Sequence, residues 1–262
     1  MMRSLTTAGT GMIAQQNNLD VIANNLANVN TTAFKSQLAQ FMDLMYQTTR
    51  ASGAANFGNI NLPEPIQVGL GSRLAATASS FKQGALQATG NPVDMAIVGE
   101  GFFGVERPDG TLAYTRDGAF KLDSNGLLVN NDGYPLVPNI TVPTGAQAVT
   151  ISSAGIVSAI LPGSNEPTQL GQLRITLFAN PAGLTRTGQN LFVPGGASGD
   201  AQEVEPGQNG SGTIQSQHLE GSNVQVVEEM VRMILAQRAY EINSKAIQTA
   251  DDMLSVLNQL KR

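Results

Sequence analysis

The chain has 262 residues, with 15 Lys plus Arg against 20 Asp plus Glu and a formal net charge of −5 at pH 7. It contains no cysteine and one histidine, His218, which excludes thiolate metal sites, disulfides and thiol catalysis. The acidic balance argues against nucleic-acid binding, which needs a basic face. Charged residues make up only 13% of the chain, against about 25% in a typical soluble domain, so we expect other molecules to cover part of its surface.

The first predicted element is an N-terminal helix, assigned to residues 1–45. Its apolar residues recur at alternating steps of three and four, which is the spacing of a coiled-coil seam. The seam positions, all apolar but one, are Leu5, Ala8, Met12, Gln15, Leu19, Ile22, Leu26 and Val29. The only charged residues among the first 30 are Arg3 and Asp20, although a helix that faces water normally carries charge on that side.

Neither a membrane span nor a secretory signal is predicted. No stretch reaches the ~18 consecutive apolar residues that a transmembrane helix needs. Polar Thr, Gly and Gln interrupt the N-terminal segment, which therefore lacks the apolar core of a signal peptide. We expect no membrane insertion and no cleaved signal.

Residues 46–65 are rich in Ala, Gly, Asn and Pro and are predicted to be an extended linker. Residues 66–219 are predicted to form a central antiparallel β domain. Asp-Gly and Asn-Gly pairs, typical of tight hairpin turns, recur there every seven or eight residues, at Asp109-Gly110, Asp117-Gly118, Asn125-Gly126 and Asp132-Gly133. The expected strands include 112–115, 119–122, 127–129, 148–152, 156–161, 173–178 and 190–193.

Residues 220–262 are predicted to form a C-terminal helix, since neither Pro nor Gly follows Gly221 and Ser222 or Asn223 can cap its start. A helix over 222–260 would be roughly 58 Å long, too long for a compact domain of this size. The fold class is therefore α+β, with long N- and C-terminal helices paired as a coiled-coil-like core domain and a central antiparallel β domain. Each of the two helices is expected to pack a second apolar face against other copies of the chain.

No pattern of residues supports catalysis, a metal or a cofactor, and we expect no enzyme. Gly99, Gly101 and Gly104 match the spacing of a dinucleotide-binding loop, but Pro108 and the turn after it leave no room for the helix that such a loop requires. The Asp- and Asn-rich turns lack the ligand spacing of a calcium loop. His218 is expected to be structural or exposed.

Three segments resemble flagellar rod and hook proteins. They are the N-terminal ANNLANVNTTAFK at 23–35, the central GEGFF and YTRDGAF at 99–103 and 114–120, and the C-terminal SNV at 222–224 followed by EEMVRMILAQRAYEINSKAIQTADDM at 228–253. The resemblance implies a structural subunit whose end helices form a coaxial inner tube with the β domain outside. It also implies a tube that acts as a drive shaft across the periplasm, transmits torque to the hook and encloses an export channel.

The same resemblance implies the partners. They are further copies in a helical homopolymer, neighbouring proximal rod and hook subunits, the surrounding basal-body ring proteins and the flagellar type III export apparatus. Export by that apparatus removes no N-terminal segment. The family implies no nucleic acid and no cofactor.

Within this family the chain is most similar to the branch that builds the distal rod. Its length suits that branch, and the stretch from Tyr46 to Pro63, including Arg50 and Phe57, occupies the place of a rod-specific segment that the hook lacks and that is held to keep the tube straight. A proximal rod or hook subunit is the alternative within the family. An extracellular β-rich adhesin or binding module is the alternative from another class.

The assembly interface is assigned to the two helical segments. Five apolar residues of the first are expected to pack against four of the second, within and between subunits; they are Leu5, Met12, Leu19, Ile22 and Leu26 on one side and Val227, Ile234, Ile242 and Leu254 on the other. Asn24, Asn25 and Asn28 are either polar positions near a helix end or interfacial amides that fix the register between helices.

Overall fold

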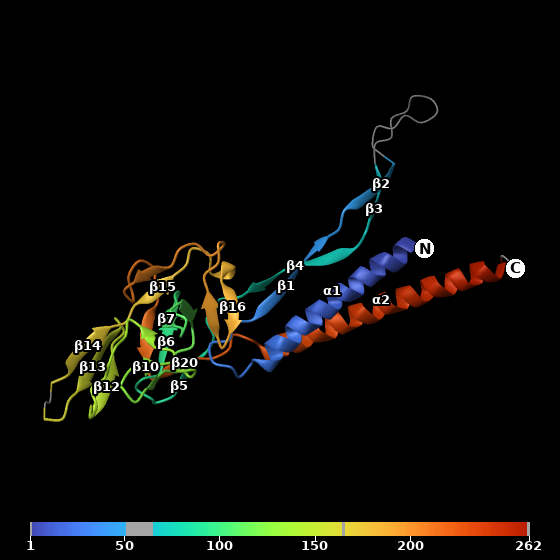
Figure 1. The fold of residues 1–262 in the computed structure, drawn as a ribbon. Coiled ribbons are helices and arrows are strands. Elements are labelled where there is room, and N and C mark those ends of the chain that lie inside the picture. The colour runs from blue at the N-terminus through green and yellow to red at the C-terminus, as the bar shows by residue number, and fades with distance from the viewer. Residues whose placement is uncertain (1, 51–64, 164–165, 261–262) are drawn as a thin grey trace. The chain divides into compact units, whose positions relative to one another are not determined.

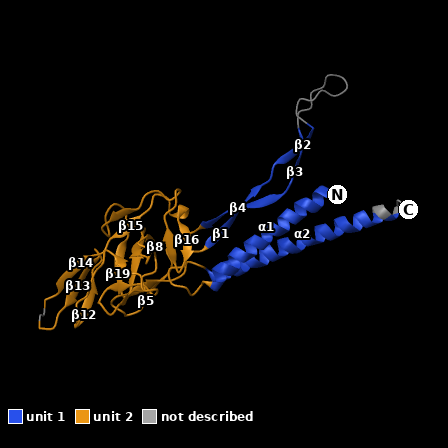
Figure 2. Ribbon diagram, viewed as in Figure 1, with its two compact units in different colours: residues 1–27, 37–78, 225–262 blue, residues 28–36, 79–224 orange. Residues whose placement is uncertain are grey.

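A computed structural model describes residues 2–50, 65–163 and 166–260 of the chain. They fall into two compact units, shown in Figure 2. The helical unit comprises Met1–Ala27, Gln37–Ala78 and Gln225–Arg262, and the central unit comprises Asn28–Ser36 and Ser79–Val224. The chain therefore passes from one unit to the other at four points.

The helical unit is built on α1 (Met2–Ala27) and α2 (Val226–Leu260), which lie side by side (Figure 1). Small residues allow the two backbones to approach. A Cβ atom added to Gly11 would lie 2.9 Å from Asn243 Nδ2, and Ala8, Ala236 and Ala250 are buried. Packing of an apolar face of this kind, more than helix propensity, stabilises long helices.

Two short antiparallel ladders complete the helical unit. Strand β1 (Gln37–Asp43) pairs with β4 (Ser72–Ser79), and β2 (Tyr46–Arg50) pairs with β3 (Ile66–Gly69). Glycine is required at Gly71, where φ is +111° and an added Cβ would collide with Thr10 of α1. The backbone at this point therefore lies directly on the helix.

The secondary structure differs from the predicted ranges at both ends. The N-terminal helix ends at Ala27 instead of 45, because Asn and β-branched Thr, poor helix formers, follow it and Ala33 adopts a positive φ of 53°. Residues 66–79, expected in the central β domain, pair with 37–50 instead. The second helix begins at Val226, and the Asn223 side chain caps no helix but bonds to Ser36 and Ser80.

The central unit is a set of small antiparallel ladders around a five-stranded sheet in the order β11-β7-β8-β17-β16. The strands of the central unit are β5 (Leu86–Ala88), β6 (Met95–Val98), β7 (Phe103–Glu106), β8 (Leu112–Thr115), β9 (Lys121–Leu122), β10 (Leu128–Val129), β11 (Leu136–Val137), β12 (Ala148–Ile151), β13 (Ile156–Ile160), β14 (Thr168–Gln172), β15 (Ile175–Leu177), β16 (Thr185–Gly188), β17 (Leu191–Val193), β18 (Gln202–Val204), β19 (Thr213–Ser216) and β20 (His218–Glu220). A short 3-10 helix covers Pro181–Gly183. The predicted α+β class and antiparallel pairing are confirmed.

Three of the four expected turn glycines, Gly110, Gly126 and Gly133, adopt the positive φ that tight turns require. Gly118 serves a different purpose, since a Cβ atom there would collide with the carbonyl oxygen of Met95. The glycine is thus needed for close packing of two backbones.

Two clusters of buried side chains form the core of the central unit. The larger includes Met95, Ile97, Phe103, Phe120 and Ile175 among its fully buried members. The smaller is aromatic and consists of Phe102, Tyr114, Phe178, Leu184 and Phe192, with Phe81 packed against it. Alternate residues of the strands supply most of these side chains, as the period of two requires.

Candidate assembly surface

One face of α2 carries a row of exposed apolar side chains. We call it the exposed stripe, and its members are Val227, Val231, Ile234, Ile242, Met253 and Val256, all between 52% and 76% exposed. Their spacings of three, four, eight and eleven residues place them on one side of a helix. The opposite side is the buried one and carries Glu229, Ala236 and Ala250.

The sequence predicted that Val227, Ile234 and Ile242 pack against the first helix within the chain as well as between chains. All three belong to the exposed stripe, so the intrachain part of that expectation does not hold. Leu254 differs, because it is half-buried on the other side of α2. Small and polar residues, which a search for large apolar seams passes over, occupy the buried side of α2.

The predicted residues of α1 are more deeply placed. Ile22 is 3% exposed, while Leu5, Met12, Leu19 and Leu26 are half-buried. Each of these half-buried side chains keeps surface that a neighbouring molecule can cover.

The three asparagines near the end of α1 have different environments. Asn24 is exposed, Asn28 is half-buried and accepts a hydrogen bond from the Thr31 hydroxyl (3.1 Å), and Asn25 is fully buried. The three therefore do not form one polar row.

Asn25 connects three elements of the helical unit. Its Nδ2 donates to the carbonyl oxygen of Gln37 at 2.8 Å, and its Oδ1 accepts from the amide of Gln37 at 2.9 Å. Nδ2 also lies 3.3 Å from Glu229 Oε2 on α2. The side-chain amide of Asn25 thus pairs with the backbone of Gln37 as a neighbouring strand would. It joins β1 to α1, which carries Asn25, and to α2, which carries Glu229.

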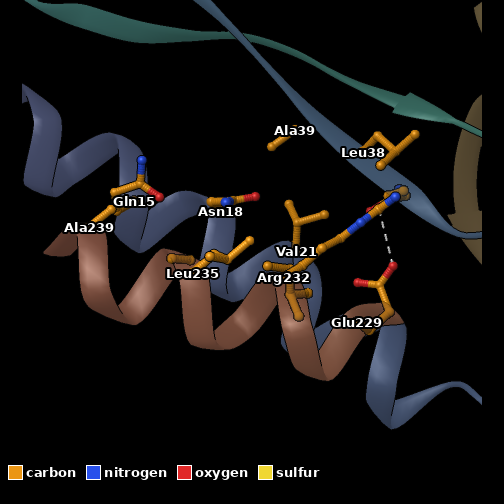
Figure 3. Close-up of a pocket in the computed structure, with 12 residues that line it drawn as sticks. Gln15, Asn18, Val21, Leu38, Ala39, Glu229, Arg232, Leu235 and Ala239 are labelled. Atoms are coloured by element: carbon orange, nitrogen blue, oxygen red, sulfur yellow. Dashed lines mark hydrogen bonds and ion pairs between the residues drawn. The ribbon is translucent and has the colours of Figure 1, made fainter. Parts of the chain in front are cut away.

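A groove of about 390 Å³ runs between α1, β1 and α2 (Figure 3). Its walls are mixed: Asn18 and Val21 of α1 face Leu235 and Arg232 of α2. Arg232 forms ion pairs with Glu229 (3.3 Å) and Glu228 (2.6 Å). No local sequence pattern predicts this groove, because its lining comes from three separate segments.

The stretch predicted to be rod-specific lies partly in the paired strands. Tyr46 and Arg50 are the first and last residues of β2, and both are exposed. Phe57 and Pro63 lie outside the described residues. Other apolar side chains of these strands and of the turns between them are also exposed, namely Leu38, Phe41, Met42, Met45, Ile66, Val68 and Leu70. The exposed apolar surface of the helical unit therefore includes strands as well as α2.

The positions considered for chemistry have structural roles. His218 Nδ1 lies 2.8 Å from the Ser216 carbonyl and Nε2 lies 3.2 Å from Gln215 Nε2, so both ring nitrogens are hydrogen-bonded. Gly99 and Gly101, both at positive φ, join β6 to β7, and a strand follows them where a dinucleotide site needs a helix. Within 2–50, 65–163 and 166–260, no three His, Asp or Glu side chains are grouped as metal ligands.

Neither α1 nor α2, over the part of each that the structure describes, combines the length and the hydropathy needed to cross a bilayer.

Sequence models of three flagellar domains match the chain in order. The model described as "Flagella basal body rod protein" matches residues 5–35, "Flagellar hook protein FlgE/F/G D1 domain" matches 96–159, and "Flagellar basal body rod FlgEFG protein C-terminal" matches 215–260. The first and last models coincide with much of α1 and α2, and the middle one lies in the central unit.

Similar full-length proteins share a name. The flagellar basal-body rod protein FlgG of Borreliella burgdorferi is 53% identical over 264 residues, covering all of both chains. That of Buchnera aphidicola subsp. Schizaphis graminum is 48% identical over 99% of this chain and 100% of its own. The flagellar hook protein FlgE of Helicobacter mustelae is 44% identical over only 51% of this chain and 30% of its own.

Proposed function

Because this chain belongs to the FlgG family of flagellar basal-body rod proteins and is a structural subunit of the rod, we propose that the exposed stripe of α2 is the surface through which copies assemble into a straight tube. The helices of successive copies pair as a coiled-coil-like inner wall that encloses the export channel. The central unit faces outward, toward the ring proteins of the basal body.

The observation that supports this proposal is the solvent exposure of the stripe. Val227 is 76% exposed and Ile242 is 66% exposed. Burying a fully exposed side chain of this size contributes roughly 1.5–3 kcal/mol, and each of the six stripe residues, between 52% and 76% exposed, retains a corresponding fraction of that gain. Several exposed apolar side chains on one side of a helix are typical of a protein–protein interface.

The sparse charge of the N-terminal thirty residues supports the same assignment. Half-buried Leu5, Met12, Leu19 and Leu26 leave apolar surface on α1 that an adjacent copy covers. Asn24 is exposed on α1 and Asn28, just after the helix, is half-buried, whereas Asn25 is buried in its own chain. Among the three, we propose the register role for Asn24, because its side chain is the exposed one.

The distal rod is the position that the relatives favour over the hook, since the FlgG proteins match along the whole chain and the FlgE protein matches along half of it. The stretch from Tyr46 to Pro63 is then the rod-specific segment that keeps the tube straight. We further propose export through the flagellar type III apparatus without a cleaved signal, a place in the rod across the periplasm, and contacts with proximal rod and hook subunits.

Complementation of a strain that lacks this gene tests the stripe. Ile234→Asp, which places a carboxylate on a residue now 56% exposed, should abolish hook assembly and motility while the purified subunit keeps the circular dichroism of the wild type. Val98→Asp is the matched control, because Val98 is also exposed and apolar but lies in the central unit. Normal rods carrying Ile234→Asp would refute the assignment.

A further inference from the structure

Three segments of the central unit meet where the chain enters or leaves it. They are 33–36, which leads into β1, 80–84, which follows β4, and 220–223, which leads into α2. We call them together the crossover junction. Every residue that defines it belongs to the central unit.

Backbone hydrogen bonds already join these segments in pairs. The amide of Ala33 donates to the carbonyl of Glu220 at 2.7 Å, and that of Ser80 donates to the carbonyl of Ser36 at 2.8 Å. A third bond, 3.3 Å long, runs from the amide of Asn223 to the carbonyl of Phe34. Each bond joins residues that are at least 44 positions apart in sequence.

The side chain of Asn223 bonds to both other segments. Its Oδ1 accepts from the amide of Ser36 at 2.7 Å, and its Nδ2 donates to the carbonyls of Ser80 (2.8 Å) and Lys82 (3.1 Å). One side chain thus makes three hydrogen bonds to two segments that are separated in sequence by the strands β1 to β4.

A buried ion pair makes the second cross-link. Lys35 Nζ lies 2.6 Å from Glu220 Oε1, both side chains are 0% exposed, and Nζ also donates to the carbonyl of Lys82 at 2.9 Å. The same carboxylate oxygen accepts from the amide of Gly84 at 2.8 Å. Desolvation lowers the pKa of Lys35, opposed by the charge of Glu220. A buried pair adds little net stability relative to apolar packing, so its value lies in fixing a geometry.

Two arginines anchor the junction to the main sheet. Arg186 of β16 donates to the carbonyl of Lys35 and to Ser79 Oγ (3.2 Å), and its guanidinium lies 5.3 Å from the ring of Phe34 and 5.5 Å from that of Phe192. Arg116, directly after β8, lies 3.5 Å from Glu220 Oε2 and donates to the carbonyl of Gly99 at 2.6 Å. The crossing segments are therefore fixed to the five-stranded sheet as well as to each other.

The fourth crossing is held by the same sheet. Asn190 Nδ2, beside β17, donates to the carbonyl of Thr32 at 3.1 Å, in the segment 28–36 that follows α1. We propose that the crossover junction is the element through which mechanical load enters and leaves the central unit, because its hydrogen bonds join the central-unit ends of the crossing segments to one another and to the five-stranded sheet. This inference rests on the proposed role as a rod subunit.

Hydrogen exchange of the purified full-length chain tests the junction itself. Asn223→Ala removes the bond that the Ser36 amide donates to Oδ1 and both bonds from Nδ2 to the carbonyls of Ser80 and Lys82. Exchange of the Ser36 amide should speed up at least tenfold, and so should that of the Ser80 amide, which donates to the carbonyl of Ser36 and loses the support of the same side chain. Asn130→Ala is the matched control, because the Asn130 side chain also bonds to the backbone, accepting from the amides of Asp132 and Tyr134, but within a local turn. Equal exchange at Ser36 and Ser80 in both variants would overturn the proposal.

Rotation of flagella in a complemented deletion strain tests the mechanical role. Cells with Asn223→Ala should assemble hooks and filaments but rotate more slowly than Asn130→Ala cells in viscous medium at equal flagellar number. Equal speeds would overturn the mechanical role. If Asn223→Ala blocks assembly, Asn223→Asp, which keeps the acceptor for Ser36, carries the comparison. Failure of the wild-type gene to restore any rod would instead reject the proposed function.

Discussion

Asn25→Ala is expected to destabilise the helical unit by about 2–4 kcal/mol. The substitution removes both bonds to the backbone of Gln37 and the bond to Glu229. A buried polar group left without its partner costs about 1–3 kcal/mol, and the half-buried position of Gln37 lets water replace part of the lost bonding. Glu229 keeps its pairing with Arg232.

Urea unfolding of the full-length chain, followed by circular dichroism at 222 nm, measures this loss, because α1 and α2 dominate that signal. With a denaturant dependence of roughly 1–3 kcal/mol per molar urea, the midpoint should fall by about 1 M or more. Gln16→Ala, on an exposed position of the same helix, is the control and should leave the midpoint within error.

Asn25→Asp separates hydrogen bonding from side-chain volume. The aspartate keeps an acceptor for the Gln37 amide, but it loses the donor and brings a second carboxylate close to Glu229. At pH 7 we expect a midpoint no higher than that of Asn25→Ala. A wild-type midpoint in either variant would refute the view that this amide joins β1 to the helices.

Three further predictions concern the central unit and use urea unfolding of the same chain. Phe102→Ala should cost about 3–5 kcal/mol, since the ring is 1% exposed and lies 5.4 Å from Phe81; a loss below about 1 kcal/mol contradicts this packing. Gly101→Ala should lower the free energy of unfolding by about 1–3 kcal/mol or more, because φ is +129° and the new Cβ would collide with Ile175. Gly90→Ala is the control and should lower it less, because Gly90 also has a positive φ but an added Cβ would meet open space. Burial raises the pKa of Asp117 above 3.8 in the folded state. The contribution of this carboxyl group to the free energy of unfolding is therefore fully present below pH 3.8 and is lost as pH rises through the raised pKa. Asp117→Asn should flatten that decline in stability with pH, and an unchanged slope would contradict the role given to Asp117.

Local patterns were sufficient to identify several elements. The periodicity of three and four in the first segment predicts α1, and the run without Pro or Gly after Gly221 predicts α2. Spacing of Asp-Gly and Asn-Gly pairs predicts hairpins, and strands such as β8 and β12 lie where the apolar runs between turns placed them. These features depend on residues close in sequence, so a local pattern contains them.

Local sequence patterns predicted less well where each helix or strand ends and which strands pair. The pairing of β1 with β4 and of β2 with β3 joins segments on either side of 51–64, and no local pattern states that partnership. The large apolar residues of α2 do not mark its buried side, and only the tertiary structure shows that this side carries Glu229, Ala236 and Ala250. Asn25 and Asn223 look like ordinary helix-end residues until their distant partners are known.

By itself, the sequence determined that this protein is an α+β chain with apolar helices at both ends, sparse charge and no cysteine, and its motifs identified the rod and hook family. Only the tertiary structure decided that the exposed stripe of α2 is the one with Val227 and Ile242, and that Lys35, Glu220 and Asn223 meet at one junction. The physical reason is distance along the chain. Helix and turn formation depend on neighbours within a few residues, whereas a buried ion pair such as Lys35–Glu220 joins groups 185 positions apart and exists only when the whole unit has folded.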